Sequence, residues 1–94
     1  MNDLDELMKD PRSRYIVTRI IELMSEEKPV SMESPDDQKR MLFIYIKFLE
    51  RIGEMTSSGE LGRLGYKPIV DRQGNKILRE EDLGELLVNF YRGL

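Results

Sequence analysis

Apolar residues recur at helical spacing in four stretches of this chain, separated by proline, glycine and charged residues. Because a helix turns once in about 3.6 residues, this spacing places the apolar side chains of each stretch on one face. The pattern predicts four helices, over about residues 2–9, 11–26, 35–53 and 82–92. It therefore indicates a mainly α fold, with residues 1–94 forming one small helical domain.

Local signals set the expected ends of these helices. Asp10-Pro11 and Ser34-Pro35 each combine a good capping residue with a proline that suits the first helical position. Asp82 and Glu85 have the spacing of a capping pair at the start of the last helix. Gly53 is expected to end the third helix, since glycine is the residue most often found just past a helix.

The stretch 35–53 is the most apolar of the four. Its middle, residues 41–46, is composed like a buried strand, but the caps before it and the charged residues after it favour a helix. On a helix the apolar side chains cover roughly 200°, a wider arc than the ~100° stripe of an ordinary surface helix. We therefore expect a central helix that neighbours cover from two sides.

Residues 56–65 contain three glycines and two serines, which predicts a loop with room for one helical turn around Leu61 and Leu64. Two short β-prone runs follow and predict a hairpin over about residues 67–79, before the last helix. A four-residue loop from Arg72 to Asn75 would pair Val70 with Ile77 and place Arg72 at the tip. We expect this register rather than that of a two-residue Gly74-Asn75 loop.

Composition excludes several function classes. The 94 residues contain neither histidine nor cysteine, so the commonest general base, thiolate chemistry and the commonest metal ligands are all missing. Carboxylates cluster at Asp36-Asp37 and Glu80-Asp82, where helix starts account for them. The glycines of residues 59–65 match no phosphate-binding motif. The sequence thus predicts a protein that is not an enzyme and has neither metal nor cofactor.

The composition also bears on where the protein works. The longest apolar run is far shorter than the ~20 residues of a membrane helix, and the first residues are acidic where a signal peptide is basic. We therefore expect a cytoplasmic protein without a membrane partner. Charged residues make up 35% of the chain, a balance common in thermophile proteins, although six oxidisable methionines weaken that inference.

Charge is distributed unevenly along the chain. Residues 61–79 hold five basic residues against Asp71 alone, a net charge of +4, so the rest of the chain carries −7. The basic residues are Arg63, Lys67, Arg72, Lys76 and Arg79. A basic hairpin of this kind can lie along the phosphates of a nucleic acid. Lysine and arginine also serve simply to block edge-to-edge pairing of exposed hairpins, which is the other interpretation.

Residues 46–53 followed by this basic hairpin resemble the recognition helix and wing of winged-helix regulators. The resemblance covers less than half of the chain and implies an autonomous DNA-binding regulator. The sequence departs from the pattern in two ways. Only residues 31–40 are available for the intervening helix, and Asp36 and Asp37 would face the DNA backbone.

Phe43 is the apolar residue that the helical pattern leaves out of place. It projects into a face that also carries Lys47, Glu50 and Glu54. One interpretation is that the N-terminal helix covers it, through Leu4 and its neighbours; the other is that it anchors a protein partner.

Together these features predict a non-enzymatic accessory or adaptor subunit. It would bind a larger protein through its apolar helices, with Phe43 among the contacts, and the basic hairpin would lie near phosphate within nucleic-acid machinery. Chains this short with surplus apolar surface are commonly subunits, so a homo-oligomer is a further expectation. The alternative is the winged-helix-type regulator.

Overall fold

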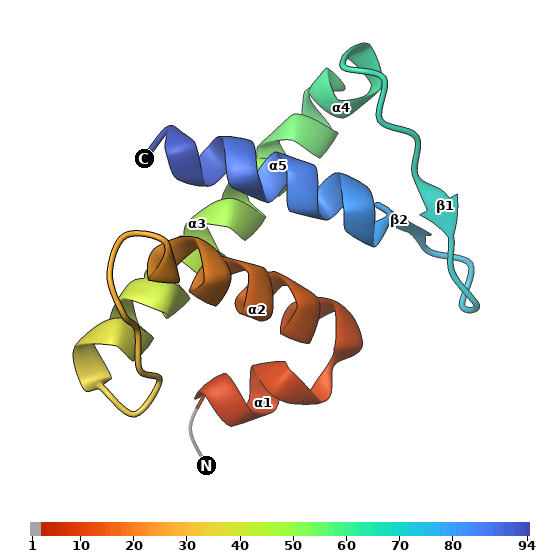
Figure 1. The fold of residues 1–94 in the computed structure, drawn as a ribbon. Helices are drawn as coiled ribbons and strands as arrows, with labels where there is room; N and C mark the ends of the chain where they lie inside the picture. Colours follow the sequence, from red (N-terminus) through yellow and green to blue (C-terminus); the bar gives the residue numbers. More distant parts are fainter. Residues whose placement is uncertain (1–2) are drawn as a thin grey trace.

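The computed structural model describes residues 3–94 and confirms a mainly helical fold with one short hairpin before α5 (Figure 1). The helices of this part of the chain are α1 (Asp3–Lys9), α2 (Pro11–Ser25), α3 (Pro35–Ser57), α4 (Glu60–Arg63) and α5 (Glu80–Arg92). The antiparallel strands are β1 (Ile69–Val70) and β2 (Lys76–Ile77). Residue 2, the first of the predicted helix 2–9, lies outside the described residues.

The two proline-containing helix starts form as their sequences predict. The Asp10 carboxylate accepts a hydrogen bond from the backbone N–H of Ser13 at 2.9 Å, and the Ser34 hydroxyl accepts one from the N–H of Asp37 at 3.4 Å. Each cap satisfies one of the backbone donors that a helix leaves unpaired in its first turn. The boundaries at Pro11 and Pro35 are therefore set by local chemistry.

The prediction that Gly53 ends the third helix is wrong, because α3 continues to Ser57. Gly53 keeps a right-handed conformation, whereas Gly59 has a φ of 79° and is the residue at which the chain turns into α4. Met55, just beyond Gly53, is buried in the core. Burial of that side chain favours further helix over a stop at the glycine.

The last helix also begins earlier than its capping pair suggests. α5 starts at Glu80, and its N-cap is Arg79, which makes no side-chain capping bond. Asp82 therefore lies inside the first turn, with Glu80 and Glu81, where three carboxylates complement the positive end of the helix dipole. The acidic cluster thus has the structural role that its position indicates.

The hairpin has a different register from the predicted one. Val70 pairs with Lys76, and Ile69 pairs with Ile77. The Asp71 carboxylate causes the shift, because it accepts hydrogen bonds from the N–H groups of Gln73 and Asn75, both at 2.9 Å. Gly74, with a φ of 84°, completes the tight turn that this carboxylate organises.

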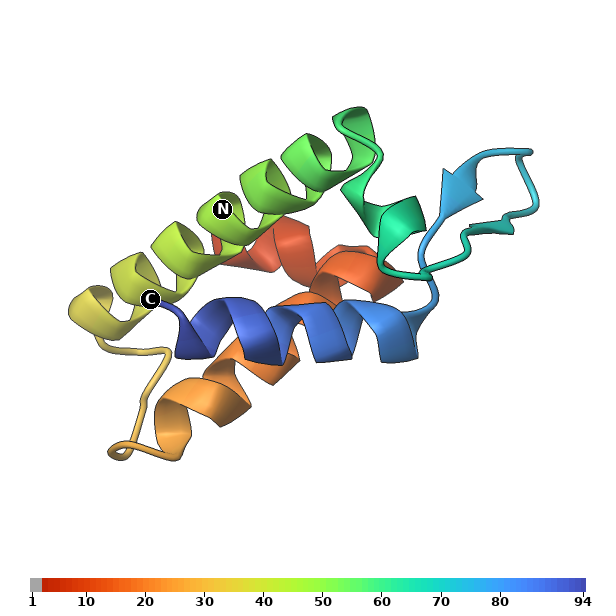
Figure 2. The same ribbon diagram turned by 90° about the horizontal axis from the view of Figure 1, so that it is seen from above.

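The core lies where α2, α3 and α5 meet. α2 packs against both α3 and α5, and Figure 2 shows α3 along one edge of the helical body with the other two helices on the same side of it. The largest fully buried side chains come from these three helices: Phe48, Ile20, Met24, Met41, Leu87 and Val17. In the part of the chain that is described, no helix is long and apolar enough to cross a membrane.

α2 and α5 approach each other closely at Gly84. A Cβ atom at this buried glycine would lie 2.6 Å from the hydroxyl oxygen of Tyr15, and 3.6 Å from the next atom of that ring. The first distance is shorter than real Cβ contacts, while the second is an ordinary contact. Only the tyrosine hydroxyl, at the end of a half-buried side chain, would therefore have to move to admit a side chain at position 84.

We expect Gly84→Ala to lower the free energy of unfolding by about 1 kcal/mol, because an overpacking cost of 1–3 kcal/mol outweighs the ~1 kcal/mol that alanine gains in helix propensity. In a Tyr15→Phe background the same change should become neutral or stabilising. Urea denaturation of the four proteins of this double-mutant cycle measures the difference. An equal cost of Gly84→Ala in both backgrounds would contradict the proposed clash.

Candidate functional site

The outer side of α3 carries large apolar side chains that the fold does not cover. Phe43 is 57% exposed, Ile46 is 54% exposed and Leu49 is 43% exposed, and Leu42 beside them is half-buried. The expectation that neighbours cover the central helix from two sides is therefore wrong. α3 buries Met41, Ile44, Tyr45, Phe48 and Met55 on one side only.

The interpretation that the N-terminal helix covers Phe43 is also wrong. α1 packs against α2, and its apolar side chains Leu4, Leu7 and Met8 are partly buried against the core. Since those side chains are used in the core, they leave Phe43 in solvent. The ammonium group of Lys47 lies 5.7 Å from the centre of the Phe43 ring, a cation–π contact that covers one face of the ring at most.

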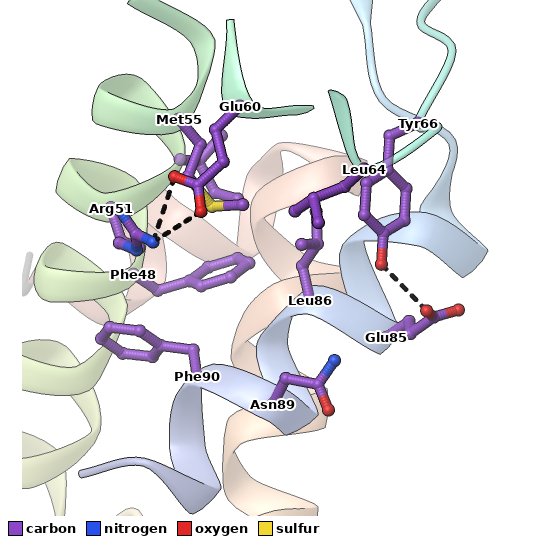
Figure 3. A pocket seen from close by; sticks show the side chains of 11 residues that line it. Phe48, Arg51, Met55, Glu60, Leu64, Tyr66, Glu85, Leu86, Asn89 and Phe90 are labelled. Carbon is purple, nitrogen blue, oxygen red and sulfur yellow. Dashed lines mark hydrogen bonds and ion pairs between the residues drawn. The ribbon is translucent and has the colours of Figure 1, made fainter. Parts of the chain in front are cut away.

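A groove with a volume of about 490 Å³ opens between α3, α4 and α5 (Figure 3). We call it the α3–α5 groove. Its floor is apolar: Phe48, Met55 and Leu86 are buried, and Phe48 packs against Phe90 with ring centres 5.7 Å apart. Leu64 stands at the rim and is 57% exposed. The groove therefore offers apolar surface that is reachable from solvent.

A hydrogen-bonded polar pair connects two elements on each of two walls of the α3–α5 groove. The Arg51 guanidinium donates to both carboxylate oxygens of Glu60, each at 3.2 Å, which ties α3 to α4. On the opposite wall the Tyr66 hydroxyl donates to the Glu85 carboxylate at 2.9 Å, which ties the chain before the hairpin to α5. Figure 3 shows both pairs flanking the apolar floor.

These pairs also determine the charge of the rim. The hydrogen bond to Glu85, together with partial burial, raises the pKa of the Tyr66 hydroxyl above its ordinary value, so the phenol stays a neutral donor. Arg51 balances the charge of Glu60, whereas within the described residues the hydrogen-bond partner of Glu85 is the neutral Tyr66. The rim is therefore acidic overall.

The five basic residues predicted to contact nucleic acid are only partly brought together. Arg72 and Lys76 lie on the hairpin, which projects from the helical body in both ribbon views, and Lys67 precedes it. None of these three exposed side chains forms an ion pair within residues 3–94. Arg63 instead donates to the carbonyl oxygen of Ser58 at 3.0 Å, and Arg79 lies 3.8 Å from Glu81.

The sequence singles out Phe43, although not its exposure, and gives no direct sign of the α3–α5 groove. The residues that shape it, Arg51, Glu60, Tyr66 and Glu85, come from separate elements and have no shared motif. Their only sequence signal is the unusual run of glycines between α3 and the hairpin, which lets the chain fold back. Within the described residues no group of three or more acidic side chains is placed to hold a metal ion.

No protein-family model, no curated protein and no solved structure matches this chain.

Proposed function

We propose that this protein is a non-enzymatic adaptor that binds an amphipathic segment of a larger protein in the α3–α5 groove. The observation that carries the proposal is the combination of an apolar floor with the exposed Leu64 at its rim. Such a groove matches the way in which amphipathic helices dock, with large apolar side chains inserted into the floor.

The charge of the rim indicates the kind of segment that fits. Glu85 is an exposed carboxylate at the rim, and the charge of Glu60 is balanced by Arg51. A partner with lysine or arginine beside its apolar anchors would complement this rim, whereas an acidic partner would be repelled. The proposed ligand is therefore a basic amphipathic helix.

A library of displayed helical peptides tests this proposal directly. We expect selected peptides to combine two or more large apolar residues with basic flanks, and to bind the protein with one-to-one stoichiometry. Leu64→Lys should weaken their binding at least tenfold, because it places a charge at the rim of the apolar floor. Val70→Lys, at a 65% exposed valine on the hairpin, is the matched control and should leave binding unchanged.

Two results would overturn the proposal. One is the failure to select any peptide that Leu64→Lys discriminates against. The other is selection of acidic peptides, since these cannot complement Glu85. Circular dichroism of both lysine variants checks that each keeps its helices, so that loss of binding reflects the groove itself.

A second candidate function is contact with nucleic-acid phosphate through the hairpin. The observation that favours it is that Lys67, Arg72 and Lys76 are exposed and form no ion pair in the described part of the chain. For an autonomous winged-helix-type regulator the support is weaker. Glu50 and Glu54 line the exposed side of α3, where they would face phosphate, and α4 separates α3 from the hairpin.

A further inference from the structure

The exposed apolar side chains of α3 have the spacing of a helix-pairing seam. Leu42, Ile46, Leu49 and Gly53 follow one another at intervals of four, three and four residues, as in the a and d positions of a coiled coil. We call these four residues, with Phe43 beside them, the outer stripe. The α3–α5 groove uses Phe48 and Met55 on another side of the same helix. The outer stripe is therefore a separate surface.

The glycine at position 53 also indicates a contact at this surface. Glycine inside an exposed helix costs about 1 kcal/mol relative to alanine. A Cβ atom at position 53 would meet no atom of the chain within 4 Å, and the backbone there does not adopt a positive φ. The fold of one copy therefore does not require this glycine. Close approach of another backbone is the circumstance in which a missing side chain is useful.

Charges along the exposed side of α3 select the orientation of a partner helix. The exposed Lys39 lies near its N-terminal end, just after the carboxylates of the first turn, and the exposed Glu54 lies near its C-terminal end. Two copies of α3 in parallel would place like charges side by side. In an antiparallel pair Lys39 of each helix can face Glu54 of the other, which is attractive.

We infer that a second copy of this chain covers the outer stripe, with the two α3 helices antiparallel about a twofold axis near Ile46 and Lys47. In this arrangement Lys39 of each copy faces Glu54 of the other, and Phe43 is covered by the opposite helix. Lys39 forms no ion pair within the described residues of its own copy, so it is available for this contact.

The pairing goes beyond the proposed function, because it would give the adaptor two grooves in one assembly. From Lys39 to Glu54 the contact extends for about 22 Å, at 1.5 Å per residue. A contact between two single helices buries an area at the small end of the range for specific interfaces. We therefore expect monomer and dimer to exchange, on the order of micromolar concentrations, rather than an obligate dimer.

Sedimentation equilibrium over a hundredfold range of concentration tests this inference. The unmodified protein should pass from monomer to dimer mass, and Ile46→Lys should remain monomeric throughout, because it buries a charge on the twofold axis. Val70→Lys and Leu64→Lys should both still dimerise, which separates this surface from the hairpin and from the groove. A monomer at every concentration, or an assembly that Ile46→Lys does not affect, would overturn it.

Exchanging the charges of Lys39 and Glu54 tests whether the two α3 helices are antiparallel. Lys39→Glu and Glu54→Lys should each weaken the dimer about five- to tenfold, because each replaces two attractive contacts by repulsive ones. The double variant, or a mixture of the two single variants, should recover the lost affinity. Since the two positions are about 22 Å apart on one helix, a contact inside one copy cannot produce this recovery. Failure of both combinations to recover affinity would rule out the antiparallel pair.

Discussion

Phe48→Ala is expected to lower the free energy of unfolding by 3–5 kcal/mol, the range measured for loss of a fully buried phenylalanine. Phe48 is completely buried and packs against Phe90 across the floor of the α3–α5 groove. For a domain of this size such a loss is a large fraction of the total stability. Urea denaturation monitored by circular dichroism measures it.

Phe43→Ala provides the matched control for this experiment. It removes the same side chain from the same helix, five residues earlier, but from a position that is 57% exposed. We expect the free energy of unfolding of the monomer to change by less than about 0.5 kcal/mol. The two variants should differ by several kcal/mol, and similar losses in both would show that Phe43 belongs to the core.

The second large effect is expected at the hairpin, if it touches nucleic-acid phosphate. Each phosphate contact contributes about 0.9 to the slope of log affinity against log salt for duplex DNA, through release of counterions. Changing Arg72, Lys76 and Arg79 together to glutamine should therefore flatten the slope by about two to three units. Fluorescence anisotropy with labelled duplexes of unrelated sequence, at several salt concentrations, measures it.

A matched variant controls for net charge. Glutamine at Lys9, Lys28 and Arg92 removes three positive charges from the helical body instead, and should shift affinity without changing the slope by more than about one unit. Equal slopes for both triple variants would show that the hairpin makes no phosphate contact. No binding by the unmodified protein at low salt would have the same meaning, and the basic side chains would then only protect the edges of the hairpin.

The helix starts at Asp10 and Ser34 were predictable because capping is a local interaction. The side chain and the backbone N–H that it accepts from are three residues apart in each case. The end of α3 was not predictable in this way. Glycine ends a helix only where the chain leaves it, and burial of Met55 keeps the chain helical beyond Gly53. That burial depends on tertiary contacts that a local pattern does not contain.

The same distinction between local and tertiary interactions applies to the surfaces. The position of Phe43 among charged residues could be anticipated from helical geometry, but its exposure could not, because that depends on where α1 packs. The register of the hairpin could not, since it depends on which backbone groups the Asp71 carboxylate binds. The groove was the least predictable feature. Its walls are 34 residues apart in sequence, from Arg51 to Glu85, and only the packing of α3 and α5 brings them together.

The pairing of α2 with α5 has a consequence for biosynthesis. α2 is made before α5, which packs over it and places Gly84 against Tyr15. While the intervening residues are being translated, the apolar side chains of α2, such as Val17 and Ile20, have only α1 and α3 as neighbours. A nascent chain that stops before residue 80 would therefore present an uncovered apolar face, which is the kind of surface that chaperones hold and that aggregates. The domain can close only after α5 has left the ribosome.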